Sequence, residues 1–416
     1  MDRSMRQLEL FEGSPPKQHT LSNDMASTLN RMRIATVTPV GGEQWTVSNV
    51  RKIGVIRIGD QQILIRPKVP VSRLFFMMQY ALHPKFWRDE EIQLDTDQDL
   101  LSVMAVAFLQ QVSKIRQNGI IQGYETFNDA LPMMRGRLDI AAQISRRGGL
   151  ALPAEVVYDE FTTDVPENRM LVSALHRLLK LPMLDPGIRA GLRKLTQSFV
   201  GVKLHIPGQE LPTFRYTRIN SRYRQAILLS EVILRNSSVE QVKGQLTASA
   251  FLLDMWRIFE DFVTVALADS FAAIDGKATR QETGTFLDKG GKLALRPDLV
   301  WHGSKQRLAI IDAKYKASDS ANYPNADIYQ MLAYCVRFGL DAGHLIYAKG
   351  PEDVLSHDVI GHQTTVHCHA VDLSQPPSGL LKQMSNLASL IVDSGSREFT
   401  ASNPAPRTPR FNNTGS

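Results

Sequence analysis

The chain has 416 residues, and its excess of Lys and Arg over Asp and Glu gives a net charge of +6 and a pI near 9.2. This length allows two domains, and 43% hydrophobic with 22% charged residues is ordinary for a soluble globular protein. The positive charge suits a polyanionic partner but does not require one.

Two further counts exclude other classes of protein. Cys335 and Cys368 are the only cysteines, which argues against a disulfide framework or a cysteine-rich zinc site and suits a reducing cytoplasm. No apolar run reaches membrane-spanning length, and the N-terminal segment MDRSMRQLELFEGSPPKQ lacks the apolar core of a signal peptide. We therefore expect a cytoplasmic protein with no membrane partner.

The chain falls into four predicted regions. Residues 1–23 are polar and contain a Pro-Pro pair, which predicts a flexible tail. Residues 24–165 begin with short runs of β-branched residues separated by Gly-Gly and Gly-Asp, which predicts a β-rich domain. Residues 166–395 are predicted to hold a helical connector and an α/β domain with a mixed sheet flanked by helices. Residues 396–416 are rich in Pro, Ser and Asn, which predicts disorder.

A long helix is predicted over residues 246–271, where FLLDMWRIFEDFVTVALADSF is mostly apolar and carries Glu260. Glu260 could serve a site, although a solvated helix face explains it equally well. Strands over residues 278–287 and 292–301 are then expected to pair around the turn from Asp288 to Gly291.

Two strand-like runs, LALRPDLVWH and RLAIIDAKYK, are joined by the turn-like GSKQ. Asp298 lies on the first run, and Asp312 and Lys314 lie two residues apart on the second. The two-residue period of a strand places Asp312 and Lys314 on one face. An apolar strand that becomes charged at its C-terminal end is expected to leave a core and enter a cleft.

This set of residues suits phosphodiester hydrolysis. Two carboxylates can hold Mg²⁺, which prefers oxygen ligands, and the metal would polarise a phosphoryl oxygen and make hydroxide available near neutral pH. A neighbouring lysine can orient the water or offset charge that develops on the phosphate. The alternative is an exposed hairpin with ordinary surface charges, because an Asp-x-Lys triplet is common by chance.

A helix is predicted over residues 325–338, on which Gln330 and Tyr334 are neighbours because they lie four residues apart. Each could belong to the site or to the rim of the helix. Strands are predicted over residues 343–349 and 366–373. The second strand places His367 and His369 on one face, where two histidines could bind a metal, but no third ligand is evident and we expect structural roles.

The order of an acidic helix, Pro-Asp, Asp-x-Lys and Gln-x-x-x-Tyr resembles the PD-(D/E)xK nuclease superfamily in its RecB-like form. More closely, the chain resembles the McrC family, the nuclease subunits of McrBC modification-dependent restriction systems. The stretches that carry this resemblance are RGRLDI (135–140), YDEFTTDVPENRMLVSAL (158–175), MWRIFEDFV (255–263), RPDLV (296–300), IIDAKYK (310–316) and DIYQMLAY (327–334). The resemblance implies a restriction-endonuclease-like C-terminal domain.

The resemblance also implies roles for the site residues. Asp298 and Asp312 match metal-binding positions, Lys314 matches the catalytic lysine, and Glu260 matches an accessory metal position. Gln330 and Tyr334 match accessory catalytic positions. The implied activity is Mg²⁺-dependent endonucleolytic cleavage of double-stranded DNA that carries 5-methylcytosine.

The implied partner is a McrB-like hexameric AAA+ GTPase of the bacterial cytoplasm. Residues 24–165 are expected to dock on this partner and to suffice for stimulating its GTPase. The chain lacks the GxxxxGK[ST] phosphate loop, so GTP is expected to act only through the partner. Two alternatives stay open: a RecB-like repair or defence nuclease with another motor, and a structural adaptor or GTPase activator with an idle nuclease site.

Overall fold

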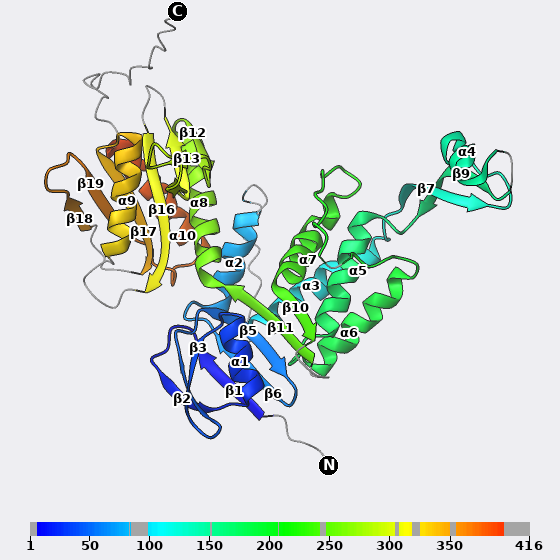
Figure 1. Ribbon diagram of the computed structural model, residues 1–416, viewed down its shortest axis with the longest axis horizontal. Coiled ribbons are helices and arrows are strands. Elements are labelled where there is room, and N and C mark those ends of the chain that lie inside the picture. Colours follow the sequence, from blue (N-terminus) through cyan, green and yellow to red (C-terminus); the bar gives the residue numbers. More distant parts are fainter. Residues whose placement is uncertain are drawn as a thin grey trace, which may run out of the picture. The chain divides into compact units, whose positions relative to one another are not determined.

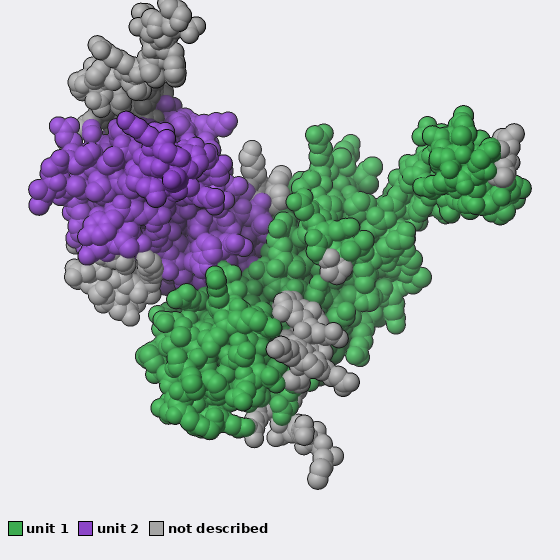
Figure 2. Space-filling model, viewed as in Figure 1, with its two compact units in different colours: residues 1–75, 92–254 green, residues 76–91, 255–416 purple. Residues whose placement is uncertain are grey.

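The computed structural model describes residues 6–82, 84, 99–149, 152–206, 208–241, 247–303, 308–317, 325–349 and 355–394. The chain divides into two compact units, one of residues 1–75 with 92–254 and one of residues 76–91 with 255–416 (Figure 2). The predicted boundary at residue 165 therefore lies inside the first unit. The division falls after Asp254 because the strand that ends there belongs to a sheet of the first unit.

The first unit contains a five-stranded sheet in the order β1-β6-β5-β11-β10 (Figure 1). Its strands are β1 (Arg6–Phe11), β5 (Lys52–Ile58), β6 (Gln61–Arg66), β10 (Ser237–Gln241) and β11 (Thr247–Asp254). A three-stranded sheet of β2 (Lys17–Thr20), β4 (Gln44–Ser48) and β3 (Thr36–Gly41) and helix α1 (Asn23–Arg31) complete this part. Leu10, Leu29, Ile56 and Ile63 lie in its buried core, so the β-rich character matches the prediction.

The predicted flexible tail is wrong for residues 6–23. Strand β1 pairs in parallel with β6, where Leu8 opposes Ile63 and Leu10 opposes Ile65. Leu10 is buried, so β1 is held by both hydrogen bonds and apolar packing. Strand β2 pairs with β4. Residues 1–5 and the predicted disordered segment 396–416 lie outside the described residues.

Helices form the rest of the first unit: α3 (Leu100–Gln117), α5 (Pro166–Leu179), α6 (Pro186–Thr196) and α7 (Arg224–Asn236). Between α3 and α5 the chain forms an arm of β7 (Gly123–Leu131), β8 (Arg137–Leu138), α4 (Ile140–Arg147) and β9 (Ala154–Thr162). Strand β9 pairs with both β7 and β8. Gly136 before β8 has a φ of +70°, and a Cβ there would lie 2.3 Å from the carbonyl oxygen of Val157, so glycine is required at this turn.

The second unit is built on a six-stranded mixed sheet in the order β12-β15-β16-β17-β19-β18. The strands are β12 (Lys277–Arg280), β15 (Leu299–His302), β16 (Leu308–Ala317), β17 (Ala342–Lys349), β18 (Leu355–Asp358) and β19 (Thr365–Ala370). Strand β15 pairs antiparallel with both β12 and β16, strands β16, β17 and β19 run parallel to one another, and β18 pairs antiparallel with β19. The predicted mixed sheet is therefore present.

Helices cover both faces of this sheet. Helix α9 (Asn325–Phe338) packs on one face, where Met331 and Tyr334 join Ile310 and Leu345 in a buried cluster. Helix α8 (Met255–Ile274) packs on the other face, where Phe271 stacks on Trp301 with ring centroids 5.2 Å apart. Helix α10 (Pro377–Ser394) packs beside α8. Helix α2 (Val71–Leu82) spans the division between the units.

The structure corrects two element boundaries near the predicted site. The predicted helix over residues 246–271 is strand β11 as far as Asp254, because this segment pairs with β5 and β10, and helix α8 runs from Met255 to Ile274. The predicted strands over 278–287 and 292–301 are each interrupted. Their ends pair with each other as β13 (Thr285–Phe286) and β14 (Ala294–Leu295) around the predicted turn, whereas β12 pairs with β15.

Candidate active site

Three of the predicted site residues converge at the start of β15, beside the middle of β16. The two strands are antiparallel, with Leu299 opposite Ile311, so the residue before β15 lies beside the C-terminal part of β16. The residue in that position is Asp298, whose Oδ2 accepts a hydrogen bond of 2.8 Å from the backbone N–H of Ala313. Asp298 therefore precedes the strand on which it was predicted to lie.

Asp312 and Lys314 share one face of β16, as their spacing predicts. Asp312 is 2% exposed, and its carboxylate forms an ion pair with the ammonium group of Lys314. Burial of the pair requires that each charge keep a partner, because an unpaired charge in the interior is strongly unfavourable. The carboxylates of Asp298 and Asp312 thus meet beside a lysine, where the apolar first part of β16 is followed by charged residues.

A chain of hydrogen bonds leads from Lys314 to helix α9. The Lys314 ammonium donates to Gln330 Oε1 at 3.0 Å, and Gln330 Nε2 donates to the Tyr334 hydroxyl at 2.7 Å. The Tyr334 hydroxyl donates in turn to the backbone carbonyl of Arg296 at 3.1 Å. The helix spacing of four residues makes this possible, and the chain fixes the direction of the Lys314 side chain.

Glu260 reaches the same place from helix α8. It shares a hydrogen bond with the Asp298 side chain, and Gln281 Nε2 lies 3.4 Å from its Oε1. The backbone N–H of Gln281 donates to the carbonyl of Asp298 at 2.9 Å, and Gln281 holds a φ of +47°. This left-handed conformation is strained in a residue with a Cβ. This conformation ends β12 and turns Gln281 toward Glu260 and Asp298.

Sequence reasoning missed Gln281 and Asp327. Gln281 lay inside a predicted strand, and its positive φ leaves no sign in the residue type. Asp327 is buried in the first turn of α9, where it accepts a hydrogen bond of 3.2 Å from the Tyr347 hydroxyl and adds negative charge near Asp312. Its one sequence signal is its position three residues before Gln330 on the same helix.

The acidic residues of the site hold their protons more tightly than usual. Burial, followed by the charges of Asp312 and Glu260, raises the pKa of Asp298 to about 8. Burial also raises the pKa of Asp312, although Lys314 opposes this, and burial raises the pKa of Glu260. For Lys314, burial disfavours the charge, but the carboxylates of Asp312 and Asp298 outweigh it and raise its pKa.

The donor set fits a hard divalent cation such as Mg²⁺. Asp298 and Asp312 supply carboxylate oxygens with Glu260 adjoining, and their mutual repulsion is the kind that a bound cation relieves. Within the described residues, no three His, Cys, Asp or Glu side chains are grouped as a ready-made metal site. Mg²⁺ tolerates such a sparse set because it retains several water ligands.

The histidines of β19 lie on the opposite face of the sheet. The prediction named His367 and His369 without a third neighbour, but the structure adds His344 from β17, whose Nδ1 lies 3.1 Å from His369 Nε2. The His344 ring stacks on both of the others, with centroids 5.2 and 5.3 Å away. His344 and His369 are joined by a hydrogen bond, and no group of three His, Cys, Asp or Glu side chains among the described residues is placed to hold a metal, which favours a structural role.

A protein-family model described as "McrBC 5-methylcytosine restriction system component" matches residues 47–348 of the chain. The chain belongs to this family. The match covers the sheet of the second unit as far as β17 and includes Glu260, Asp298, Asp312, Lys314, Gln330 and Tyr334. The resemblance seen in the motifs is thus confirmed for this McrBC-family chain.

Two solved structures are similar to this McrBC-family chain. A chain of the refined half-complex from the tetradecameric assembly of Thermococcus gammatolerans McrB AAA+ hexamers with bound McrC matches with a TM-score of 0.58 at 15% identity, covering 92% of this chain and all of that one. A chain of the Thermococcus gammatolerans McrBC complex matches at 17% identity with a TM-score of 0.42, covering 64% of this chain and 88% of that one. The first match shows a shared fold.

No curated protein matches the sequence significantly. Among the described residues, every helix is too short or too polar to span a bilayer.

Proposed function

We propose that this chain is a Mg²⁺-dependent DNA endonuclease subunit that hydrolyses phosphodiester bonds. The observation that carries the proposal is the convergence of Asp298, Asp312 and Lys314 at the meeting of β15 and β16, with both carboxylates largely withdrawn from solvent. The α8-β12-β15-β16-α9-β17 order, with Asp298 directly before β15 and Asp312 midway along β16, supports a PD-(D/E)xK arrangement.

Each residue has a proposed task. Asp298 and Asp312 hold the cation, and Glu260 stands beside them as an accessory ligand. The bound metal supplies positive charge to the phosphoryl oxygen and lowers the pKa of a water molecule. Lys314 orients the attacking water or offsets charge that develops on the phosphate. Gln330 and Tyr334 keep the Lys314 ammonium in place through their hydrogen bonds.

The proposed substrate is double-stranded DNA that carries 5-methylcytosine, and the proposed partner is a McrB-like hexameric AAA+ GTPase, so that GTP acts through the partner alone. The family description and the Thermococcus assembly, in which McrC is bound to McrB hexamers, support both. They favour this system over a RecB-like nuclease with another motor. The intact Asp298, Asp312 and Lys314 set favours an active nuclease over an adaptor with an idle site.

The proposed docking element is the arm within the predicted docking region, residues 24–165. Large apolar side chains of this arm are exposed to solvent, which is typical of a protein interface. They include Met133, Met134, Ile140, Ile144 and Leu152. We expect this arm to contact the GTPase and stimulate it.

The nuclease proposal is tested by plasmid cleavage with Mg²⁺, GTP and the partner. Asp312→Asn should abolish cutting while circular dichroism and assembly with the partner stay unchanged. Asp393→Asn is the matched control, because Asp393 is an exposed aspartate of α10 in the same unit. Undiminished cutting by the Asp312 variant would reject the assignment.

The docking proposal is tested in the full chain. Ile144→Asp should weaken assembly and reduce stimulation of GTP hydrolysis, because a charge would enter an apolar interface. Ile360→Asp is its control, since Ile360 is an exposed isoleucine of the second unit. Equal effects of the two variants would argue against the arm as the docking element.

A further inference from the structure

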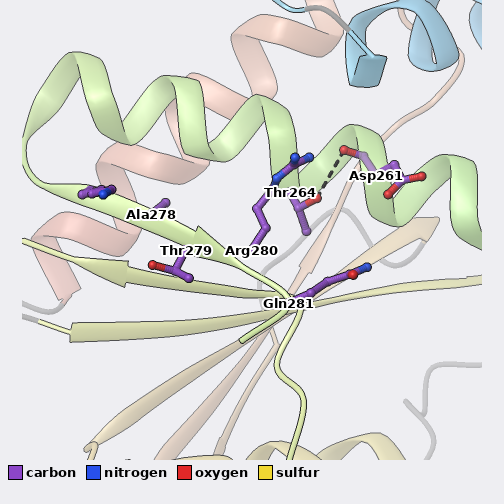
Figure 3. A pocket seen from close by; sticks show the side chains of 7 residues that line it. Asp261, Thr264, Ala278, Thr279, Arg280 and Gln281 are labelled. Carbon is purple, nitrogen blue, oxygen red and sulfur yellow. Dashed lines mark hydrogen bonds between the residues drawn. The ribbon is translucent and has the colours of Figure 1, made fainter. Parts of the chain in front are cut away.

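A groove runs between helix α8 and strand β12, beside the candidate active site (Figure 3). It has a volume of about 470 Å³. Asp261 and Thr264 line it from α8, and Lys277, Ala278, Thr279, Arg280 and Gln281 line it from β12 and the residue that follows. Figure 3 shows the Arg280 side chain extending from the strand toward Thr264 and Asp261 on the helix.

The groove carries two cationic side chains that form no ion pair within the described part of the chain. Lys277 and Arg280 are both exposed, and neither forms an ion pair with another described residue. Asp261 is the one acidic side chain among the residues that line the groove, and Arg257 and Arg280 both act on its charge. Two cationic residues and one acidic residue therefore line the groove, and this excess of positive charge favours an anionic ligand.

The other donors of the groove suit phosphate groups. Thr279 offers a hydroxyl group, Gln281 offers a side-chain amide, and β12 stands at the edge of its sheet as far as the described residues show. Lysine, arginine, threonine, glutamine and free backbone N–H groups are the donors that proteins present to the DNA backbone. Lysine and arginine along an edge strand also discourage pairing with a strand from another protein.

Gln281 connects the groove to the candidate active site. It lines the groove, and it also bonds to the Glu260 carboxylate and to the backbone carbonyl of Asp298. At about 3.3 Å per strand residue, Lys277 lies about 13 Å along β12 from Gln281. Each nucleotide of a DNA strand carries one phosphate, so a groove of this length can meet more than one backbone phosphate.

We propose that this groove binds the backbone phosphates of the DNA strand next to the scissile phosphate, with Lys277 and Arg280 as the charged contacts. The inference rests on the proposed nuclease function and deepens it. Such contacts fix the path of the strand, so that one phosphodiester enters the space between Asp298, Asp312 and Lys314. They are independent of base sequence, so recognition of the modified base lies elsewhere in the system.

The test is the salt dependence of DNA binding by the full-length protein. A fluorescein-labelled duplex is titrated in EDTA, which prevents cutting, at several salt concentrations, and binding is followed by anisotropy. Each lost phosphate contact reduces the slope of log affinity against log salt by about 0.9, so Lys277→Gln with Arg280→Gln should reduce it by about 1.8. Lys277→Gln alone is matched with Lys382→Gln, an exposed lysine of α10 outside the groove, which should leave the slope unchanged.

A second readout separates DNA contact from damage to the metal site. Mn²⁺ binding, followed by electron paramagnetic resonance, should be unchanged in the double variant, and Arg280→Lys should keep the wild-type salt slope. A wild-type slope in the double variant would overturn the inference, as would weaker assembly with the GTPase at unchanged DNA binding, which would make the groove a protein-binding site. If the nuclease proposal itself fails, Asp312→Asn still cuts DNA, so the two failures are distinguishable.

Discussion

The backbone N–H of Ala313 donates a 2.8 Å hydrogen bond to the carboxylate of Asp298, and so ties the acidic residue directly before β15 to the backbone of β16. Ala313 lies between Asp312 and Lys314, whose side chains project from the same face of β16. The bond therefore places the Asp298 carboxylate against both functional side chains. The acidic pair and the lysine depend on one backbone register between β15 and β16.

Removing the hydroxyl group of Tyr334 should slow cutting without unfolding the protein. Tyr334→Phe deletes the bond from Gln330 and the bond to the Arg296 carbonyl, so Gln330 holds Lys314 less firmly. A hydrogen bond of about 1 kcal/mol predicts a loss of about fivefold in cutting rate. The measurement is single-turnover cleavage with the partner, and Tyr329→Phe on the exposed side of the same helix is the control. A rate equal to wild type would show that Tyr334 does not position the lysine.

Substitutions at Gln281 should separate backbone strain from function. Gln281→Val should destabilise the protein by about 1–3 kcal/mol, because a β-branched residue resists the φ of +47°. Gln281→Gly should fold at least as stably as wild type, since glycine accepts this conformation, yet it should cut DNA more slowly because the contact with Glu260 is lost. Urea unfolding and cleavage assays measure the two effects. If the glycine variant cuts as fast as wild type, the side chain of Gln281 has no positioning role.

Stability without metal should depend on pH through Asp298. Its pKa is raised to about 8 in the folded protein, above the ordinary aspartate value, so the folded state holds a proton that the unfolded state has released. The stabilising contribution of the protonated Asp298 carboxyl is therefore complete at low pH and is lost as the pH rises toward 8. Urea unfolding in EDTA should show the folded protein weakening from pH 6 to pH 8, and Asp298→Asn should flatten this trend.

Metal binding should show the opposite trend. Only the ionised carboxylate binds a cation, so Mg²⁺ affinity should rise with pH up to about 8, with release of a proton. Calorimetric titration in buffers of different ionisation enthalpy measures that proton. Binding that is independent of pH between 6 and 8 would contradict the assignment of Asp298 as a ligand.

The buried histidines should make the second unit sensitive to acid. Burial, followed by the charge of His367, lowers the pKa of His369 to about 4, and burial, followed by the charges of the other two histidines, lowers the pKa of His344 well below its usual range. The unfolded chain then takes up protons below pH 6.5 that the folded chain does not, so stability should fall as pH decreases from 6.5 toward 4. His369→Gln should lose less stability than wild type between pH 7 and pH 5, measured by urea unfolding. An equal loss would place the acid sensitivity elsewhere.

Sequence patterns were sufficient to predict the arrangement of site residues that lie on the same strand or the same helix. The period of a strand predicted that Asp312 and Lys314 share a face, and the helix spacing predicted that Gln330 and Tyr334 are neighbours. The pairing of strands that lie far apart in the sequence could not be predicted from such local patterns. The apolar run at 251–253 fits a helix as well as a strand, and only its pairing with β5 decides. The same holds for β1, whose partner lies 55 residues along the chain, as Arg6 pairs with Gln61.

The place of β11 in the first sheet has a consequence for synthesis of the chain. This strand comes from residues 247–254, yet it pairs with β5, whose residues leave the ribosome much earlier. Until Asp254 emerges, the hydrogen-bonding edge of β5 is open to any extended segment nearby. A fragment that stops at residue 165 has the same open edge, so it would be prone to aggregate. The residues that stimulate the partner's GTPase are therefore better identified by substitutions in the intact chain.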